Sequence, residues 1–116
     1  MTEKEYKKIF EEYLSAVLNG LGDGLLEQAM KYVLSAGGKR IRPVLTLAVA
    51  NCLGVPSEKV LPFACSLEII HNSSLVHDDL PCIDNDDYRR GRLSCHKKFG
   101  ESTAVLCGDA LQNFAY

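Results

Sequence analysis

The sequence predicts an all-helical fold, organised as a single domain over residues 1–116. Apolar residues recur every three or four positions along most of the chain, which is the period of a packed helix face. No stretch alternates like a strand for long. Glycines and prolines interrupt the pattern at helix-length intervals, so each apolar stripe has a natural end. A helical bundle is therefore the expected architecture.

The first two helices are each recognised by an apolar stripe. One is expected over residues 3–19, and the other begins at Leu25 after a run of glycines. Asp23 is placed to cap the second helix, and the pair Gly37-Gly38 ends it. The inward residues are Tyr6, Ile9, Phe10, Tyr13, Leu14 and Val17 in the first helix, and Leu25, Leu26, Ala29, Met30, Val33 and Leu34 in the second.

Three further helices follow. Pro43 suits the first turn of the third helix, which runs to Leu53 and stops at Gly54. Ser57 is expected to cap the fourth, which continues to a group of aspartates; Pro62 in its early turns either kinks it or moves its start later. The fifth helix opens at Ser102 or Glu101, with Val105, Leu106, Leu111 and Phe114 inward.

Composition excludes several classes of protein. A net charge of −2 gives no reason to expect nucleic acid as a partner. No apolar run reaches the roughly 20 residues that a membrane span needs, and the charged N-terminus lacks the apolar core of a signal peptide. A cytoplasmic location is therefore expected. The five cysteines form no CxxC pair, which favours reduced, largely buried thiols over a zinc site.

The stretch HDDLPCIDNDDYRRG, residues 77–91, holds five aspartates in ten positions. Like charges this close repel, so a bound cation is the expected partner. His71, Ser74 and Asp78 share one face of the fourth helix, and Pro81 is expected to turn the chain so that Asp84 returns beside Asp78. Two carboxylates facing a cleft suit magnesium, which keeps waters and takes phosphate oxygens. A calcium loop is excluded, because neither the glycine nor the final glutamate falls at the required position.

A second charged cluster is GGKRIRP, residues 37–43. A glycine pair followed by Lys39, Arg40 and Arg42 at a helix entrance can hold a phosphate through backbone amides and charge-assisted hydrogen bonds. The spacing is not that of a P-loop. Taken alone, such a turn is more often simply solvated, and a lone His71 more often satisfies a hydrogen bond in the core.

Taken together, these motifs have the order and the residue sequences of the motifs of a known family. GGKRIRP, EIIHNSSLVHDDLPCIDNDDYRRG, HKKFGE and GDAL, between residues 37 and 111, closely resemble the trans-prenyl diphosphate synthases that make farnesyl or geranylgeranyl diphosphate. The resemblance implies an isoprenoid synthase fold, a homodimer, and head-to-tail condensation of isopentenyl diphosphate with an allylic diphosphate. It also implies magnesium held by Asp78, Asp79 and Asp84, the allylic diphosphate gripped by Arg89, and isopentenyl diphosphate bound by Lys39, Arg42, His71 and Arg90.

The resemblance covers only the N-terminal part of such an enzyme, since the family's second aspartate-rich motif does not appear. The 116 residues alone are therefore expected to self-associate and to lack prenyl transferase activity. Two alternatives stay open: a non-catalytic, diphosphate-binding subunit completed by a partner chain, and another isoprenoid enzyme such as a cyclase. GGKRIRP argues against a cyclase, which has no second diphosphate to hold.

Product length turns on Ser73 and Ser74. In the family, the residues four and five before the first aspartate line the floor of the pocket for the growing tail. A bulky aromatic there stops growth near fifteen carbons, because a close-packed wall does not yield. Two serines leave the floor open, which favours geranylgeranyl over farnesyl diphosphate as the product.

Overall fold

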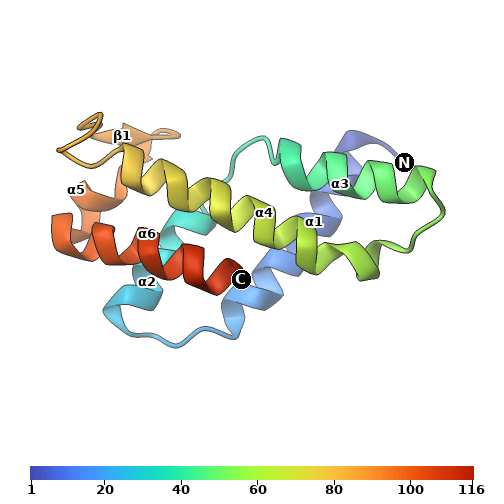
Figure 1. Ribbon diagram of the computed structural model, residues 1–116, viewed down its shortest axis with the longest axis horizontal. Helices are drawn as coiled ribbons and strands as arrows, with labels where there is room; N and C mark the ends of the chain where they lie inside the picture. Colours follow the sequence, from blue (N-terminus) through green and yellow to red (C-terminus); the bar gives the residue numbers. More distant parts are fainter.

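The computed structural model describes all residues 1–116 and confirms the all-helical prediction. Six helices are joined by short loops, and a two-stranded hairpin lies near the C-terminal end of the longest helix (Figure 1). The elements are α1 (Glu3–Asn19), α2 (Leu25–Leu34), α3 (Ile41–Cys52), α4 (Ser57–Asp78), β1 (Tyr88–Arg89), β2 (Arg92–Leu93), α5 (Cys95–Phe99) and α6 (Glu101–Ala115).

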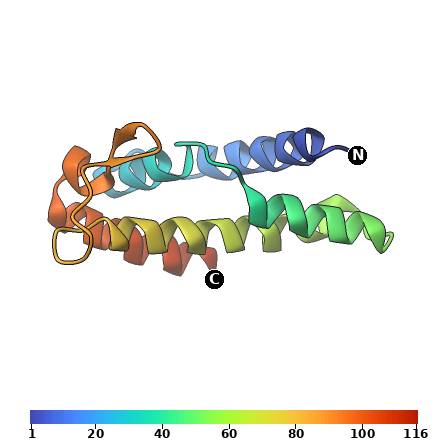
Figure 2. The same cartoon turned by 90° about the horizontal axis from the view of Figure 1, so that it is seen from above.

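The helices form two layers. Figure 2 shows α1 and α2 following one another in the first layer, with α3, α4 and α6 in the second. Helix α4 runs through the middle of the molecule and packs against both α3 and α6. The segment between α2 and α3, which carries the glycine pair, crosses from the first layer to the second (Figure 2). This crossing brings the basic cluster to the flank of α4.

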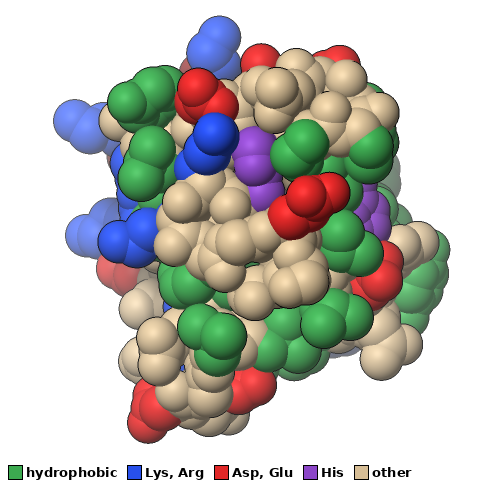
Figure 3. Space-filling view, turned by 90° about the vertical axis from the view of Figure 1, so that its left-hand side faces the viewer, with side chains coloured by type: hydrophobic (Ala, Val, Ile, Leu, Met, Phe, Trp, Pro, Cys, Tyr) green, Lys and Arg blue, Asp and Glu red, His purple; other side chains and the backbone are tan.

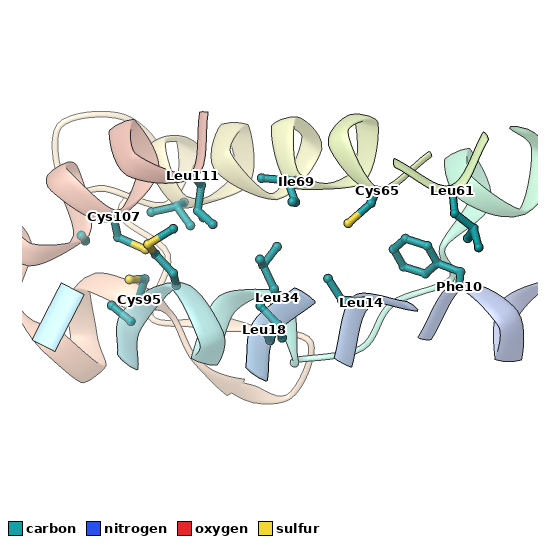
Figure 4. Packing of buried hydrophobic residues seen from close by; sticks show 14 of the residues in the cluster. Phe10, Leu14, Leu18, Leu34, Leu61, Cys65, Ile69, Cys95, Cys107 and Leu111 are labelled. Atoms are coloured by element: carbon teal, nitrogen blue, oxygen red, sulfur yellow. The ribbon is translucent and has the colours of Figure 1, made fainter. Parts of the chain in front are cut away.

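The core lies between the layers. All six helices contribute residues to the core, and the long apolar residues of α1 and α2 meet those of α4 and α6 (Figure 4). The residues that face one another there include Phe10, Leu14, Leu18 and Leu34 on one side and Leu61, Cys65, Ile69 and Leu111 on the other. Burial of these side chains stabilises the bundle, at about 1.5–3 kcal/mol for each large one.

The helix starts required two corrections. Asp23 does not cap α2: the N-cap is Gly24, whose amide donates to the side chain of Glu27 at 3.1 Å. Similarly, Ser57 is the first residue of α4 and Pro56 is its N-cap. Pro62 neither breaks α4 nor delays its start, because the helix is continuous from Ser57. In both helices the N-cap lies one residue from the expected position; Glu27 accepts from the cap amide of α2, whereas Pro56 makes no side-chain cap hydrogen bond.

The inward face of α6 was also predicted wrongly. Val105, Leu106 and Phe114 are exposed, whereas the buried face carries Ala104, Cys107 and Gly108 together with Leu111, as predicted. Small residues face inward because α6 lies very close to α4. A Cβ added to Gly108 would collide with the ring of His77. Close approach of two helices selects small side chains at the contact, and hydrophobicity alone does not reveal that choice.

The hairpin was not predicted from the sequence. Its two-residue strands are too short to produce an alternating pattern, and their register pairs Tyr88 with Leu93. Arg90 and Gly91 form the turn, with φ values of 53° and 76°. Both lie in the left-handed region that a two-residue hairpin turn of type I′ requires. Arg90 is an uncommon residue there, since asparagine or glycine usually takes this position.

All five cysteines are free thiols: Cys65, Cys95 and Cys107 are buried, and Cys52 and Cys82 are exposed. Burial raises the pKa of Cys65 to about 11, so it stays protonated and behaves as a small core residue. None of the helices has the length and apolar character required to traverse a membrane.

Candidate active site

Four exposed or half-buried residues that the sequence singled out line one pocket, and the buried Arg40 lies at its base. Lys39 and Arg42 come from the entrance to α3, His71 from the middle of α4, and Arg90 from the hairpin turn. The pocket has a volume of about 330 Å³ and only one apolar residue in its wall. We call these four residues the cationic pocket. Three segments distant in sequence therefore converge on one surface suited to an anion.

Arg40 is the exception in the basic cluster, because its side chain is buried at the base of the pocket and is already paired. Its guanidinium is 2% exposed and donates to Glu11 at 2.6 Å, to Glu68 at 3.0 Å and to the carbonyl oxygen of Leu34 at 2.7 Å. The expectation that Arg40 joins Lys39 in holding phosphate is therefore wrong. Its left-handed backbone, with φ of 56°, lets one basic residue enter the core while its neighbours stay outside.

This arrangement leaves the pocket strongly positive. Burial and the nearby Arg40 lower the pKa of Arg90, which has no carboxylate in ion-pair contact. Burial, followed by the charge of Arg42, lowers the pKa of His71 below its ordinary value of 6.5. His71 is therefore neutral at pH 7. It offers the pocket a hydrogen-bonding ring beside fixed positive charges.

The aspartates occupy the segment 78–87, which we call the aspartate segment. Asp78 is the last residue of α4, and the chain turns back as predicted, since the amide of Asp84 donates to the carbonyl oxygen of Asp78 at 2.9 Å. Asn85 continues the turn with φ of 50° and donates to Leu80. Asp78 and Asp84 are both exposed, so their carboxylates are open to a ligand.

Asp79 differs from the other aspartates because it is 3% exposed and already paired. Arg89 donates to both of its carboxylate oxygens, at 2.9 and 2.6 Å. These hydrogen bonds are the main cause of the raised pKa of Arg89. Nowhere in the chain do three or more His, Cys, Asp or Glu side chains gather as a metal cage. The aspartate segment thus presents three exposed, unpaired carboxylates (Asp78, Asp84 and Asp86), an exposed ion pair of Asp87 with Lys97, and the buried pair of Asp79 with Arg89.

The loop after the aspartates is held by its own hydrogen bonds. The carbonyl oxygen of Asp86 lies 2.7 Å from both the hydroxyl of Ser94 and Nε2 of His96, and the amide of Ser94 donates to Asp87. Tyr32 of α2 donates to the carbonyl oxygen of Leu93 at 2.7 Å. Seen from this end of the molecule, Lys and Arg gather along one side while acidic groups are spread more widely (Figure 3).

The two serines before the aspartates lie on different surfaces. Ser73 is buried between α4 and α6, where its hydroxyl donates to the carbonyl oxygen of Gly108 at 2.7 Å. Ser74 is exposed and donates to His71 one turn earlier. Their part in product length stays a prediction, but in this structure only Ser74 borders open space.

Two contacts of the cationic pocket were not predicted from the sequence, one made by Asn72 and the other by Gly38 of the glycine pair. Gly38 lies against the guanidinium of Arg90, and Asn72 accepts a hydrogen bond from Arg90 at 3.0 Å. Neither carries charge, so neither produced a signal in a search for charged ligands. The contact that gives each its role joins segments far apart in the chain.

Comparison with known proteins identifies the family of the chain. The family model for polyprenyl synthetases matches residues 23–116. The farnesyl diphosphate synthase of Geobacillus stearothermophilus is 50% identical over 97% of this chain and 38% of its own length. The large subunit 1 of the chloroplastic heterodimeric geranylgeranyl pyrophosphate synthase of Arabidopsis thaliana is 55% identical over 78% of this chain and 24% of its own length.

Solved structures show the same fold. The geranyltranstransferase of Thermotoga maritima superposes with a TM-score of 0.91 at 47% identity, covering 97% of this chain and 43% of that one. The chain thus spans between about a quarter and two fifths of the length of the two curated relatives named above. Since the family model matches most of the sequence, this chain belongs to the polyprenyl synthetase family.

Proposed function

We propose that this chain forms part of the active site of a short-chain prenyl diphosphate synthase, an enzyme that joins isopentenyl diphosphate head-to-tail to an allylic diphosphate. The observation that carries the proposal is the cationic pocket, because its four basic side chains meet there from three separate segments. Family membership supports it, and so do relatives named farnesyl and geranylgeranyl diphosphate synthases.

The cationic pocket is proposed to bind isopentenyl diphosphate. Lys39 and Arg42 are exposed and supply charge, while Arg90 offers the forked donors that match paired phosphate oxygens. His71 supplies a neutral ring. A fixed positive pocket lets one polyanion lie close to another in spite of their repulsion, which raises the rate by positioning.

The allylic diphosphate is assigned to the aspartate segment, with magnesium as its cation. Asp78 and Asp84 fit this ion, since magnesium takes one or two protein carboxylates and completes its octahedron with waters and phosphate oxygens. When bound, it supplies a Lewis acid that neutralises the leaving diphosphate. Arg89 adds a guanidinium on the same side, held by Asp79. Direct ligation of the metal by Asp79 stays a prediction, because that carboxylate is engaged here.

Titration of the 116-residue chain with isopentenyl diphosphate tests the pocket. Lys39→Ala should weaken binding about tenfold, as expected for one charge-assisted contact. Lys59→Ala is the matched control, because it removes the same charge from an exposed residue near the start of α4, about 18 Å along the helix from His71. Equal weakening by both changes would mean that the surface attracts anions generally.

Turnover tests the reaction. In a full-length enzyme carrying these residues, Asp78→Ala or Asp84→Ala should reduce prenyl transfer by orders of magnitude, while circular dichroism shows the fold intact. Near-normal activity in both variants would refute the metal assignment. Diphosphate binding without turnover in the unaltered full-length protein would instead favour the alternative, a binding subunit completed by a partner chain.

Product length, assembly and location complete the proposal. Product chromatography decides between fifteen and twenty carbons. Exposed apolar residues on α3 and α6, including Leu45, Val49 and Leu106, support a covered surface in the functional assembly. The homodimer and the cytoplasmic location stay predictions from the sequence.

A further inference from the structure

Arg89 and Arg90 are neighbours in the chain, yet they are held in opposite ways. Arg89 forms a two-point ion pair with Asp79, which neutralises its charge. Arg90 forms no ion pair; its guanidinium donates to the amide oxygen of Asn72 and lies against Gly38. Held by neutral groups, Arg90 keeps its whole charge for a ligand.

The contact between Arg90 and Gly38 is possible because glycine has no side chain. A Cβ built on Gly38 would lie 2.9 Å from Cζ of Arg90, 3.0 Å from Nη2 and 3.1 Å from Nε. The first distance is shorter than real Cβ contacts and the other two are tighter than most, so any other residue would push the flexible guanidinium away. The flat guanidinium therefore lies directly on the backbone of the loop between α2 and α3.

The contact with Asn72 fixes the other edge of the guanidinium. Asn72 is 1% exposed, and its side chain is oriented by its own donation to the carbonyl oxygen of Glu68 at 2.8 Å. Its Oδ1 is then left to accept from Nη1 of Arg90 at 3.0 Å. Because the acceptor is buried and already oriented, it defines where Arg90 lies.

The turn that carries Arg90 gives independent support. Arg90 has φ of 53°, a left-handed conformation that non-glycine residues seldom adopt. Strained backbone of this kind is kept where the surroundings determine it and where a side chain has a task. Burial and the nearby charge of Arg40 both disfavour the charged form of Arg90, so its place in the pocket needs specific holders.

We propose that Gly38 and Asn72 are positioning residues that hold Arg90 in the cationic pocket without neutralising it, so that its charge and its fork of donors meet a diphosphate anion. This inference rests on the proposed function, and it adds the means by which the pocket keeps one arginine free. The two residues act through Arg90 and touch no reacting atom.

The test uses the adjacent glycine as a matched control. Gly37 and Gly38 both have positive φ, at 87° and 119°, so an alanine at either position strains the backbone. Only at Gly38 would the new Cβ meet Arg90, since nothing lies within 4 Å of the same atom at Gly37. Two measurements are made on the 116-residue chain: the side-chain Nε–Hε resonance of Arg90 without ligand, and the affinity for inorganic diphosphate.

Gly38→Ala should move the Arg90 resonance and weaken diphosphate binding about tenfold, while Gly37→Ala changes affinity less than twofold. Asn72→Ala should move the same resonance. Asn72→Asp keeps an acceptor oxygen but adds a charge that pairs with Arg90, so diphosphate binding should stay weakened although Arg90 is still held. Equal effects of the two glycine variants, or an Arg90 resonance unmoved by Gly38→Ala, would overturn the proposal. If the unaltered chain fails to bind diphosphate, the proposed function fails, and the resonance alone decides whether the two residues position Arg90.

Discussion

The cationic pocket and the aspartate segment lie along the same helix, but they are built differently. Beneath the pocket, Arg40 is buried and paired with Glu11 and Glu68. These two carboxylates are therefore occupied, and the exposed cations of the pocket have no ion-pair partner. In the aspartate segment, Asp79 pairs with Arg89 and Asp87 with Lys97, while the other three carboxylates are exposed. The pocket is thus formed without its ligand, whereas bringing the aspartates together is the role proposed for magnesium. The predictions below test that difference.

The largest effect is expected from Arg40. Arg40→Ala leaves the buried carboxylate of Glu68 without its partner, and breaking such a pair costs about 3–5 kcal/mol. Chemical denaturation measures the free energy of unfolding. Lys39→Ala is the control, because its side chain is exposed and its loss should change stability by less than about 0.5 kcal/mol. A small effect of Arg40→Ala would mean that the pocket does not rest on this buried pair.

The second effect concerns the two serines. Ser73→Phe should destabilise the chain by about 1–3 kcal/mol, because the ring must enter the close contact between α4 and α6. Ser74→Phe, on the exposed side, should change the free energy of unfolding by less than about 0.5 kcal/mol. In a full-length enzyme, the aromatic that shortens the product identifies the floor of the tail pocket. Unchanged products from both variants would remove the serines from that role.

The third prediction separates the two regions by their response to magnesium. Magnesium should raise the affinity of the chain for inorganic diphosphate about tenfold, because phosphate oxygens complete its shell. Asp78→Asn with Asp84→Asn should abolish that gain and leave the magnesium-free affinity unchanged. Arg42→Ala should weaken the magnesium-free affinity and leave the gain from magnesium unchanged. Calorimetry with and without magnesium measures both quantities. If the aspartate variant and Arg42→Ala change the same quantity, the two regions form one site.

The smallest effect is that of pH on His71. Its pKa in the folded chain lies below the ordinary 6.5, so the unfolded chain takes up the proton first as pH falls. The stability contributed by neutral His71 is therefore present above pH 6.5 and lost as pH falls through the lowered pKa. Unfolding measured from pH 7.5 to 5 should decline more steeply for the unaltered chain than for His71→Gln. Parallel curves would contradict the lowered pKa.

Much of this molecule was determined by its sequence. The existence of the five longer helices and the turn back after Pro81 were predictable, because helix periodicity and proline chemistry act over a few neighbouring positions. The end of α2 at Leu34 and the short helix α5 were not predicted. The family resemblance likewise rests on local motifs, and the polyprenyl synthetase match over residues 23–116 confirms it.

Only the tertiary structure decided how each charged residue is used. Nothing in GGKRIRP distinguishes Arg40, which enters the core, from Lys39, which stays outside. Nothing in YRRG shows that Arg89 is paired and Arg90 free. The small inward face of α6 also depends on how closely α4 approaches. These outcomes are set by contacts between segments far apart in the chain, where burial and partner charge fix each side chain's energy, and no local pattern records them.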